Sequence, residues 1–168
     1  MQVWDKVTYV DVDSIAFAKR TVEIPSNMPK PEELPLAHKY CDLHNAGRDD
    51  EIPFKGMMLT TEVANARRIV RLENGPASFP MTFTALRVGN VAFFGIPGEP
   101  FNEIGRGVKS SKGWDMVLPT CLTGGSHGYF PVRNAYDEGG YEAKTSNFKA
   151  GVAELIIETG LDMLEKLR

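Results

Sequence analysis

A serine flanked by glycines is the first feature of this sequence that could carry out chemistry. Gly124, Ser126 and Gly128 have the G-x-S-x-G spacing of the serine-hydrolase nucleophile elbow, which presents a strained serine between a strand and a helix. The residues after Gly128 are Tyr-Phe-Pro-Val, which favour an extended or turn conformation rather than a helix. The triad also needs a histidine later in the chain, and the sequence has none beyond the adjacent His127. We therefore interpret residues 124–128 as a glycine-rich loop.

Phosphate and histidine-metal chemistry are not supported by residue spacing. Residues 95–105 match neither a dinucleotide-binding nor a P-loop fingerprint, and Glu99 within them would repel an anion. His38 and His44 are six residues apart, which is poor spacing for one helix face, and no HExxH pair is present. Each of these histidines is therefore interpreted as a surface or structural residue.

Two other segments gather residue types that are common in binding sites. Glu99 lies between Gly98 and Pro100 after an apolar strand pattern, and strand ends are where ligands often bind in α/β proteins. Residues 128–142 combine a double glycine with four polar or aromatic side chains, Tyr129, Arg133, Tyr136 and Tyr141. Turns at strand ends also use glycine and proline for conformational reasons, and tyrosines are often half-buried. Spacing alone therefore leaves a functional and a structural interpretation open.

The elements that would position these residues alternate between strand and helix patterns. We predict strands at 7–12, 20–24, 81–88, 91–94 and 115–118, with Gly89-Asn90 as a two-residue hairpin turn. We predict helices at 36–43, 57–74, 101–109 and 147–167, and we interpret Arg67, Arg68 and Arg71 as a solvated face of the second helix. This order predicts a mixed α/β fold, a mixed β-sheet with helices packed on it, in a single domain over residues 1–168.

Composition excludes several classes of protein. A chain of 168 residues is about one domain long, and 19 Lys and Arg against 22 Asp and Glu give no basic footprint for nucleic acid. The apolar runs are far shorter than the roughly 18 residues that span a bilayer, so no transmembrane segment is expected. Two cysteines cannot form a disulfide framework or a cysteine-rich zinc site. The first residues lack the pattern of a signal peptide, and the cellular location stays open.

Two motifs resemble the neutral/alkaline ceramidase family. Residues 86–105, LRVGNVAFFGIPGEPFNEIG, resemble the strand–PGE–helix segment of that family. Residues 128–142, GYFPVRNAYDEGGYE, resemble its next signature, GY-x-PT-R-x-x-Y-x-x-GGYE. The proline-rich stretch at 23–34 also resembles the family's lead into a helix. The resemblance covers most of the chain and is densest over residues 86–145.

This resemblance implies a zinc-dependent amidase that cleaves the N-acyl bond of ceramide. In the family, two histidines, a glutamate and a tyrosine hold the zinc ion, and the resemblance assigns the last two roles to Glu99 and Tyr129. It assigns to Tyr141 a catalytic role, support of the polarised amide carbonyl. Zinc lowers the pKa of its bound water to about 7, and a tyrosine O–H can donate to the oxyanion that forms when hydroxide attacks.

The sequence also departs from the family pattern. The family's zinc histidines, and an arginine and a serine of its active site, lie upstream, in sequence that this chain does not contain. His38, His44 and His127 match none of those ligands, and Val132 stands where the family has threonine. Two ligands are fewer than catalytic zinc normally takes. We therefore expect this chain to be the C-terminal part of a ceramidase-like catalytic domain that is inactive alone.

The expected partners follow from that interpretation. They are the missing N-terminal half of the catalytic domain and an N-acyl lipid or another amide substrate. The chain would be an expressed fragment, a split subunit or a decayed relative, and the alternative function is a non-catalytic binding or interaction module. A half-domain leaves apolar surface uncovered, which predicts a homo-oligomer.

Overall fold

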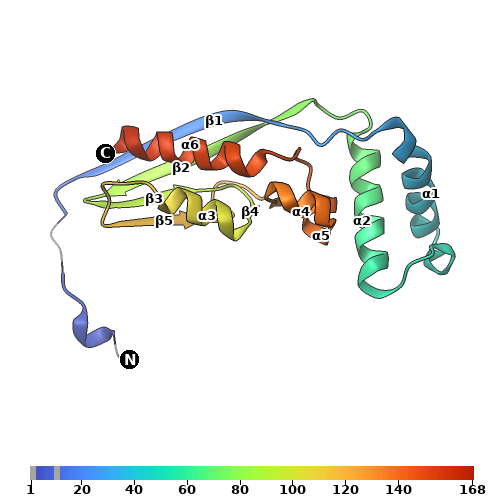
Figure 1. Cartoon of the computed structure of the whole chain (residues 1–168), viewed down its shortest axis with the longest axis horizontal. Helices are drawn as coiled ribbons and strands as arrows, with labels where there is room; N and C mark the ends of the chain where they lie inside the picture. The colour runs from blue at the N-terminus through green and yellow to red at the C-terminus, as the bar shows by residue number, and fades with distance from the viewer. Residues whose placement is uncertain (1–2, 10–11) are drawn as a thin grey trace.

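The computed structural model of the chain describes residues 3–9 and 12–168, and its centre is a mixed four-stranded sheet (Figure 1). The strand order is β1-β2-β3-β5, with β1, β2 and β3 antiparallel neighbours and β5 parallel to β3. The strands of the sheet are β1 (Ile15–Pro25), β2 (Ser78–Val88), β3 (Val91–Gly95) and β5 (Met116–Thr120). Two short strands, β4 (Glu99–Pro100) and β6 (Tyr129–Phe130), form a second, parallel pair. The mixed α/β fold predicted from the sequence is confirmed.

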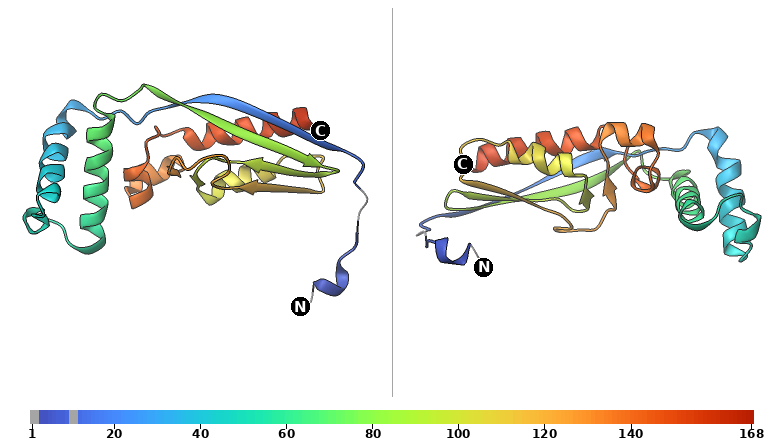
Figure 2. Two further views of the ribbon diagram at one scale, coloured as in Figure 1. Left: turned by 180° about the vertical axis from the view of Figure 1, so that it is seen from behind. Right: turned by 60° about the horizontal axis from the view of Figure 1, so that its bottom comes forward.

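Two helices, α3 (Asn102–Lys109) and α6 (Val152–Leu167), cover one face of the sheet (Figures 1 and 2). The core lies between this face and the helices, where Phe83 of β2 stacks on Phe94 of β3 with ring centroids 5.7 Å apart. Gly160 lets α6 approach closely, because an added Cβ would lie 3.1 Å from the Phe94 ring. Burial of this apolar face supplies the main stabilisation of the fold.

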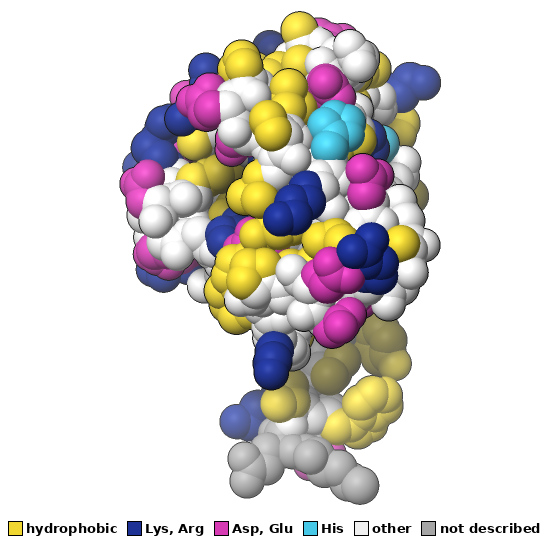
Figure 3. Space-filling model, turned by 90° about the vertical axis from the view of Figure 1, so that its right-hand side faces the viewer, with side chains coloured by type: hydrophobic (Ala, Val, Ile, Leu, Met, Phe, Trp, Pro, Cys, Tyr) yellow, Lys and Arg dark blue, Asp and Glu magenta, His cyan; other side chains and the backbone are white. Residues whose placement is uncertain are grey.

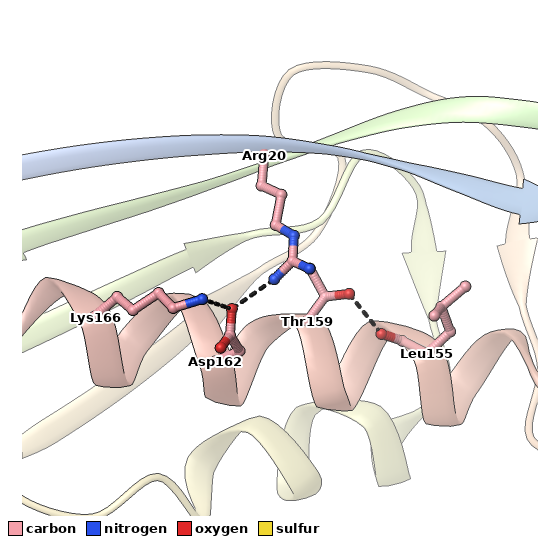
Figure 4. Close-up of polar contacts among 5 residues, drawn as sticks. All are labelled: Arg20, Leu155, Thr159, Asp162 and Lys166. Atoms are coloured by element: carbon pink, nitrogen blue, oxygen red, sulfur yellow. Dashed lines mark hydrogen bonds and ion pairs between the residues drawn. The ribbon is translucent and has the colours of Figure 1, made fainter.

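An ion pair also joins β1 to α6 (Figure 4). The Nη1 atom of Arg20 lies 2.5 Å from Oδ2 of Asp162, and Nζ of Lys166, one helical turn further on, lies 2.8 Å from the same oxygen. These side chains are partly exposed, so solvent screens the pair and it serves mainly to align the helix with the strand.

The opposite face of the sheet carries apolar side chains in register across all four strands. One row is Ile15, Val88, Val91 and Met116, and the next row on that face is Phe17, Leu86, Phe93 and Leu118. Ile15, Phe17 and Met116 are 72%, 62% and 53% exposed, respectively. The described part of the chain therefore leaves an apolar sheet face in contact with solvent.

A helical hairpin forms one end of the molecule, beyond the sheet (Figure 1). Its helices, α1 (Leu34–Asn45) and α2 (Gly56–Leu72), have a core of their own that includes Tyr40, Val63 and Ile69. The outer surface of this end mixes hydrophobic side chains with charges of both signs (Figure 3). Two short helices, α4 (Arg133–Glu138) and α5 (Tyr141–Thr145), lie between the hairpin and the end of the sheet (Figures 1 and 2).

Most predicted elements are confirmed, including the hairpin at Gly89-Asn90, but the predicted strand at 7–12 is wrong where it can be checked. Residues 7–9 and 12 form no strand, and residues 10–11 lie outside the described residues. The physical reason is register: Ile15 pairs with Val88, the last residue of β2, and the chain turns at Gly89. The neighbouring strand therefore has no residues left to pair with 7–12, and an alternating pattern without a partner does not form a strand.

The last helix starts later than predicted. The expected helix 147–167 is observed as Val152–Leu167, because residues 147–149 instead continue the pairing at the end of β1. The amide of Lys149 donates to the carbonyl of Pro25 at 3.0 Å, and Phe148 forms a bridge with Ser26.

The interpretation of Arg68 as part of a solvated helix face is wrong. Its side chain is buried, and it donates to the carbonyls of Lys144 and Asn27, each at 2.9 Å, and to Oδ1 of Asn65 at 3.1 Å. Burial lowers the pKa of Arg68 below its ordinary value. Helix α2 packs against α5 as well as α1, which covers the face that helical periodicity assigned to solvent. Arg67 and Arg71 are exposed, as predicted.

In the part of the chain that the structure describes, no helix is long and apolar enough to cross a bilayer.

Candidate functional site

The candidate site lies where two parallel strands of the sheet end. Strands β3 and β5 finish side by side, with Gly95 opposite Thr120, and each chain segment then continues into a second pair of strands. In that second pair Glu99 of β4 lies opposite Tyr129 of β6. Residues in register on neighbouring strands have side chains on the same face, so the carboxylate and the phenol extend from the same side. The structure thus brings together two residues that are thirty positions apart in the sequence.

Backbone hydrogen bonds between the two connecting loops hold this pair in place. The amide of Glu99 donates to the carbonyl of Gly128 at 2.8 Å, and the amide of Leu122 donates to the carbonyl of Gly98 at 2.9 Å. The amide of His127 donates to the carbonyl of Pro97 at 3.0 Å. The loops also require Gly98, where an added Cβ would lie 2.5 Å from the Phe130 ring and 2.6 Å from the Gly128 oxygen. The close approach of β4 and β6 therefore depends on that missing side chain.

The double glycine of the second motif returns the chain to this site. Gly139 ends α4 with φ of 72°, a left-handed conformation that glycine adopts without strain, and Gly140 is the N-cap of α5. Tyr141 is the first residue of α5, and its ring lies edge-on to that of Tyr129 with centroids 6.0 Å apart. The three residues to which the family resemblance assigns roles, Glu99, Tyr129 and Tyr141, therefore lie in one region.

Ser146, a buried residue that the sequence patterns did not indicate, holds the backbone of Tyr129 in place. The Ser146 hydroxyl donates to the Tyr129 carbonyl at 2.9 Å and accepts from the amide of Phe148 at 3.2 Å. A single serine after a helix carries no distinguishing pattern, so only the fold could identify it.

Two other residues of the second motif have structural roles. The Tyr136 hydroxyl donates to the carbonyl of Phe148 at 2.7 Å, and burial raises the pKa of this phenol. The Arg133 side chain lies 3.2 Å from a carboxylate oxygen of Glu154 on α6. Both therefore hold α4 against its surroundings rather than line the site.

The electrostatics of the site favour a cation. Partial burial raises the pKa of the Tyr129 phenol, and the nearby charge of Glu99 raises it further, with smaller effects from Tyr141 and Glu142. Glu99 is exposed and forms no ion pair or side-chain hydrogen bond with the residues that the structure describes. A carboxylate and a phenol oxygen on one side of two strands are donors that zinc accepts.

The histidines contribute little to this donor set. His38 pairs with Glu73 at 2.9 Å and His44 with Asp49 at 2.7 Å, both in the helical hairpin. His127 is exposed and lies in the loop before Tyr129, where its ring is close to Gly125. Within residues 3–9 and 12–168, no three His, Cys, Asp or Glu side chains are grouped so that they could hold a metal ion. Ser126 precedes the extended strand β6 and not a helix, which agrees with the rejection of the nucleophile elbow.

Comparison with known proteins gives a likeness in structure alone. No family model matches the chain, and no curated protein matches it. The crystal structure of neutral ceramidase from Pseudomonas aeruginosa superposes on 92% of the chain with a TM-score of 0.53 and 15% sequence identity. The fold is ceramidase-like. At this identity the likeness concerns the fold, and membership of the family stays a prediction.

The chain spans only part of the length of the proteins that it matches. The match covers 29% of the Pseudomonas aeruginosa chain. A ceramidase structure described as complexed with C2 matches 55% of this chain and 16% of its own, with 19% identity and a TM-score of 0.44, too low to support an argument. The matched region therefore spans less than a third of the length of these neighbours.

Proposed function

We propose that this chain supplies part of the active site of a ceramidase-like, zinc-dependent amide hydrolase. The observation that carries the proposal is the meeting of Glu99, Tyr129 and Tyr141 at the ends of two parallel strands. The ceramidase-like fold is consistent with it, because the family motifs then lie in the structural setting that the resemblance implies. The substrate would be an N-acyl amide, of which ceramide is one example.

Each of the three side chains would have a distinct role. Glu99 and Tyr129 would hold the zinc ion together with histidines from the missing N-terminal half of the catalytic domain. Bound zinc supplies a water molecule whose pKa is near 7 and polarises a carbonyl group. The Tyr141 hydroxyl would donate a hydrogen bond to the oxygen of the amide carbonyl as negative charge develops there.

The backbone supports these roles by holding the two short strands together. The hydrogen bonds of Glu99 and of the 121–128 loop hold β4 beside β6. Metal ligands that the fold already holds in position need little reorganisation when the ion binds.

Zinc titration of the chain with a Glu99→Gln variant tests the metal part of this proposal. We expect weak zinc binding by the chain, with the dissociation constant raised at least about tenfold by the loss of one charged ligand. Glu103→Gln is the matched control, because Glu103 is an exposed carboxylate four residues away on α3. Zinc affinity that is the same in the chain and in Glu99→Gln would contradict the proposal.

Amidase activity tests the catalytic part. The chain alone should not hydrolyse N-acyl amides, and activity should arise when the N-terminal half is added. Under the alternative function, a non-catalytic binding module, activity would stay absent after that addition. The alternative has support from the small number of metal-binding side chains that converge in the described residues.

A further inference from the structure

A cleft of about 430 Å³ opens between α2 and α5, next to the candidate site. Tyr141 and Thr145 of α5 form one wall, and residues of α2 form the other. The volume is within the range of small-molecule sites. Because Tyr141 belongs both to this wall and to the edge-on pair with Tyr129, the cleft begins at the candidate catalytic tyrosine.

The charged side chains that line this cleft are mostly positive. Arg67 and Arg71 are four residues apart on α2, so they lie on the same face of the helix. Arg67 forms no ion pair or side-chain hydrogen bond with the described residues, and Arg71 donates to the neutral amide oxygen of Asn147 at 2.5 Å. Asp49 is the one acidic residue of the lining, and it pairs with His44 at 2.7 Å. Neither guanidinium is therefore neutralised by a carboxylate of its own.

The wall formed by α2 also has an apolar part. Leu59, Val63 and Ala64 lie on the same helix as the arginines, nearer to its N-terminus. A cleft with an apolar strip and two adjacent guanidinium groups suits an amphiphile with an anionic group, because guanidinium binds carboxylate and phosphate oxygens through paired hydrogen bonds.

We propose that this cleft binds an anionic group, a carboxylate or a phosphate, on the substrate of the candidate active site. The proposal rests on the function proposed above, and it narrows the substrate class to N-acyl amides whose amine portion is negatively charged. This narrower class does not include ceramide, because the amine portion of ceramide carries no charge. N-Acyl amino acids and phosphorylated N-acyl amines belong to this class. A substrate with a neutral head group would leave both guanidinium groups without an anionic partner.

Calorimetric titration of the chain with three lauroyl amides tests the proposal, each below its micelle concentration and without zinc. The probes are N-lauroylglycine, N-lauroyl-phosphoethanolamine and the neutral N-lauroylethanolamine. We expect at least one anionic probe to bind about tenfold or more tightly than the neutral one, because charge-assisted hydrogen bonds contribute on that order. The tighter of the two anionic probes identifies carboxylate or phosphate as the preferred group.

Substitution of Arg67 tests whether the preference for anionic probes arises in the cleft. Arg67→Gln should reduce the anionic preference by about tenfold. Arg106→Gln, which removes another exposed positive charge on α3, should leave the preference unchanged. Thermal unfolding of each variant checks that it is folded. Equal affinity for all three probes, no measurable binding, or an equal effect of the two substitutions would each overturn the proposal.

The outcomes of this experiment separate the two proposals. Suppose that the anionic preference depends on Arg67 but that Glu99→Gln does not change zinc affinity. This result would support the cleft as a binding site and contradict the hydrolase function. Zinc affinity that falls in Glu99→Gln, without an anionic preference that depends on Arg67, would support the zinc site and contradict the anionic substrate class.

Discussion

Replacement of Gly98 by alanine tests whether the close approach of β4 and β6 aligns Glu99 with Tyr129. The added Cβ would lie 2.5 Å from Cε2 of Phe130 and 2.6 Å from the carbonyl oxygen of Gly128. Phe130 is fully buried and the second contact is with backbone, so neither atom can move away at low cost. The two strands must separate, and the ladder between Glu99 and Tyr129 should loosen.

The expected loss of stability follows from these contacts. Overpacking of a well-packed interior typically costs about 1–3 kcal/mol. The Gly128 oxygen also accepts the hydrogen bond of the Glu99 amide, and its weakening adds about 1 kcal/mol. Gly98→Ala should therefore lower the free energy of unfolding by about 2–4 kcal/mol, which a domain with a typical stability of about 5–15 kcal/mol survives.

Urea unfolding and zinc titration together measure the effect. The unfolding midpoint should fall, and zinc affinity measured well below that midpoint should also fall, because the two ligands are displaced. Gly105→Ala is the matched control, because its added methyl group meets no atom within 4 Å and lies within α3. Alanine in place of a helical glycine should leave stability unchanged or raise it by up to about 1 kcal/mol.

Two results would refute this reasoning. An unchanged or higher unfolding midpoint for Gly98→Ala would mean that the strands are not in close contact. A lower midpoint with unchanged zinc affinity would mean that the pairing of β4 with β6 does not position the metal ligands.

Three further predictions concern the rest of the fold. Arg68→Met should destabilise the chain by about 2–4 kcal/mol in urea, because it removes three hydrogen bonds at a buried position. Arg67→Met should change stability by less than about 0.5 kcal/mol, and similar effects of the two substitutions would contradict the burial of Arg68. Hydrogen bonds from Lys166, with help from its charge and from Arg20, lower the pKa of Asp162, so its stabilising effect is present at neutral pH and is lost as the pH falls through that lowered value. Asp162→Asn should therefore flatten the decline of thermal stability as the pH falls below about 4, the ordinary pKa of an aspartate, and an unchanged acid profile would count against the pair. The exposed apolar sheet face should make the chain associate in light scattering, and Phe17→Lys should reduce that association; a monodisperse wild-type monomer would refute it.

Local sequence patterns were sufficient to predict most elements of this fold. The periodicity of 57–74 and the Gly89-Asn90 turn between two apolar runs each depend on residues a few positions apart, and both elements are observed. The same holds for the helix after the PGE segment, α3. Such patterns report the conformation of one segment and do not include what packs against it.

Predictions that depended on distant partners failed for that reason. The alternation at 7–12 does not form a strand because β2 ends at Val88, a limit set by the register of a segment more than seventy residues away. Arg68 has neighbours in the sequence like those of Arg67, yet it is buried because α5 packs on that face of α2. Helical periodicity identifies faces, but only the tertiary packing decides how many of them are covered.

For the candidate site, too, local sequence patterns predicted some features and tertiary packing decided the others. The sequence by itself determined the residue types, through the PGE and GGYE motifs that contain Glu99 and Tyr141, and it determined that Tyr129 follows a glycine-rich loop. Only the tertiary structure decided that these residues meet. The parallel pairing of β3 with β5 brings β4 beside β6, and the turn at Gly139-Gly140 returns Tyr141 to Tyr129. The same is true of the cleft between α2 and α5, because Arg67 and Tyr141 line one cleft only when α5 packs against α2. Strand register and helix packing are set by contacts between segments far apart in the chain, and no local pattern contains that information.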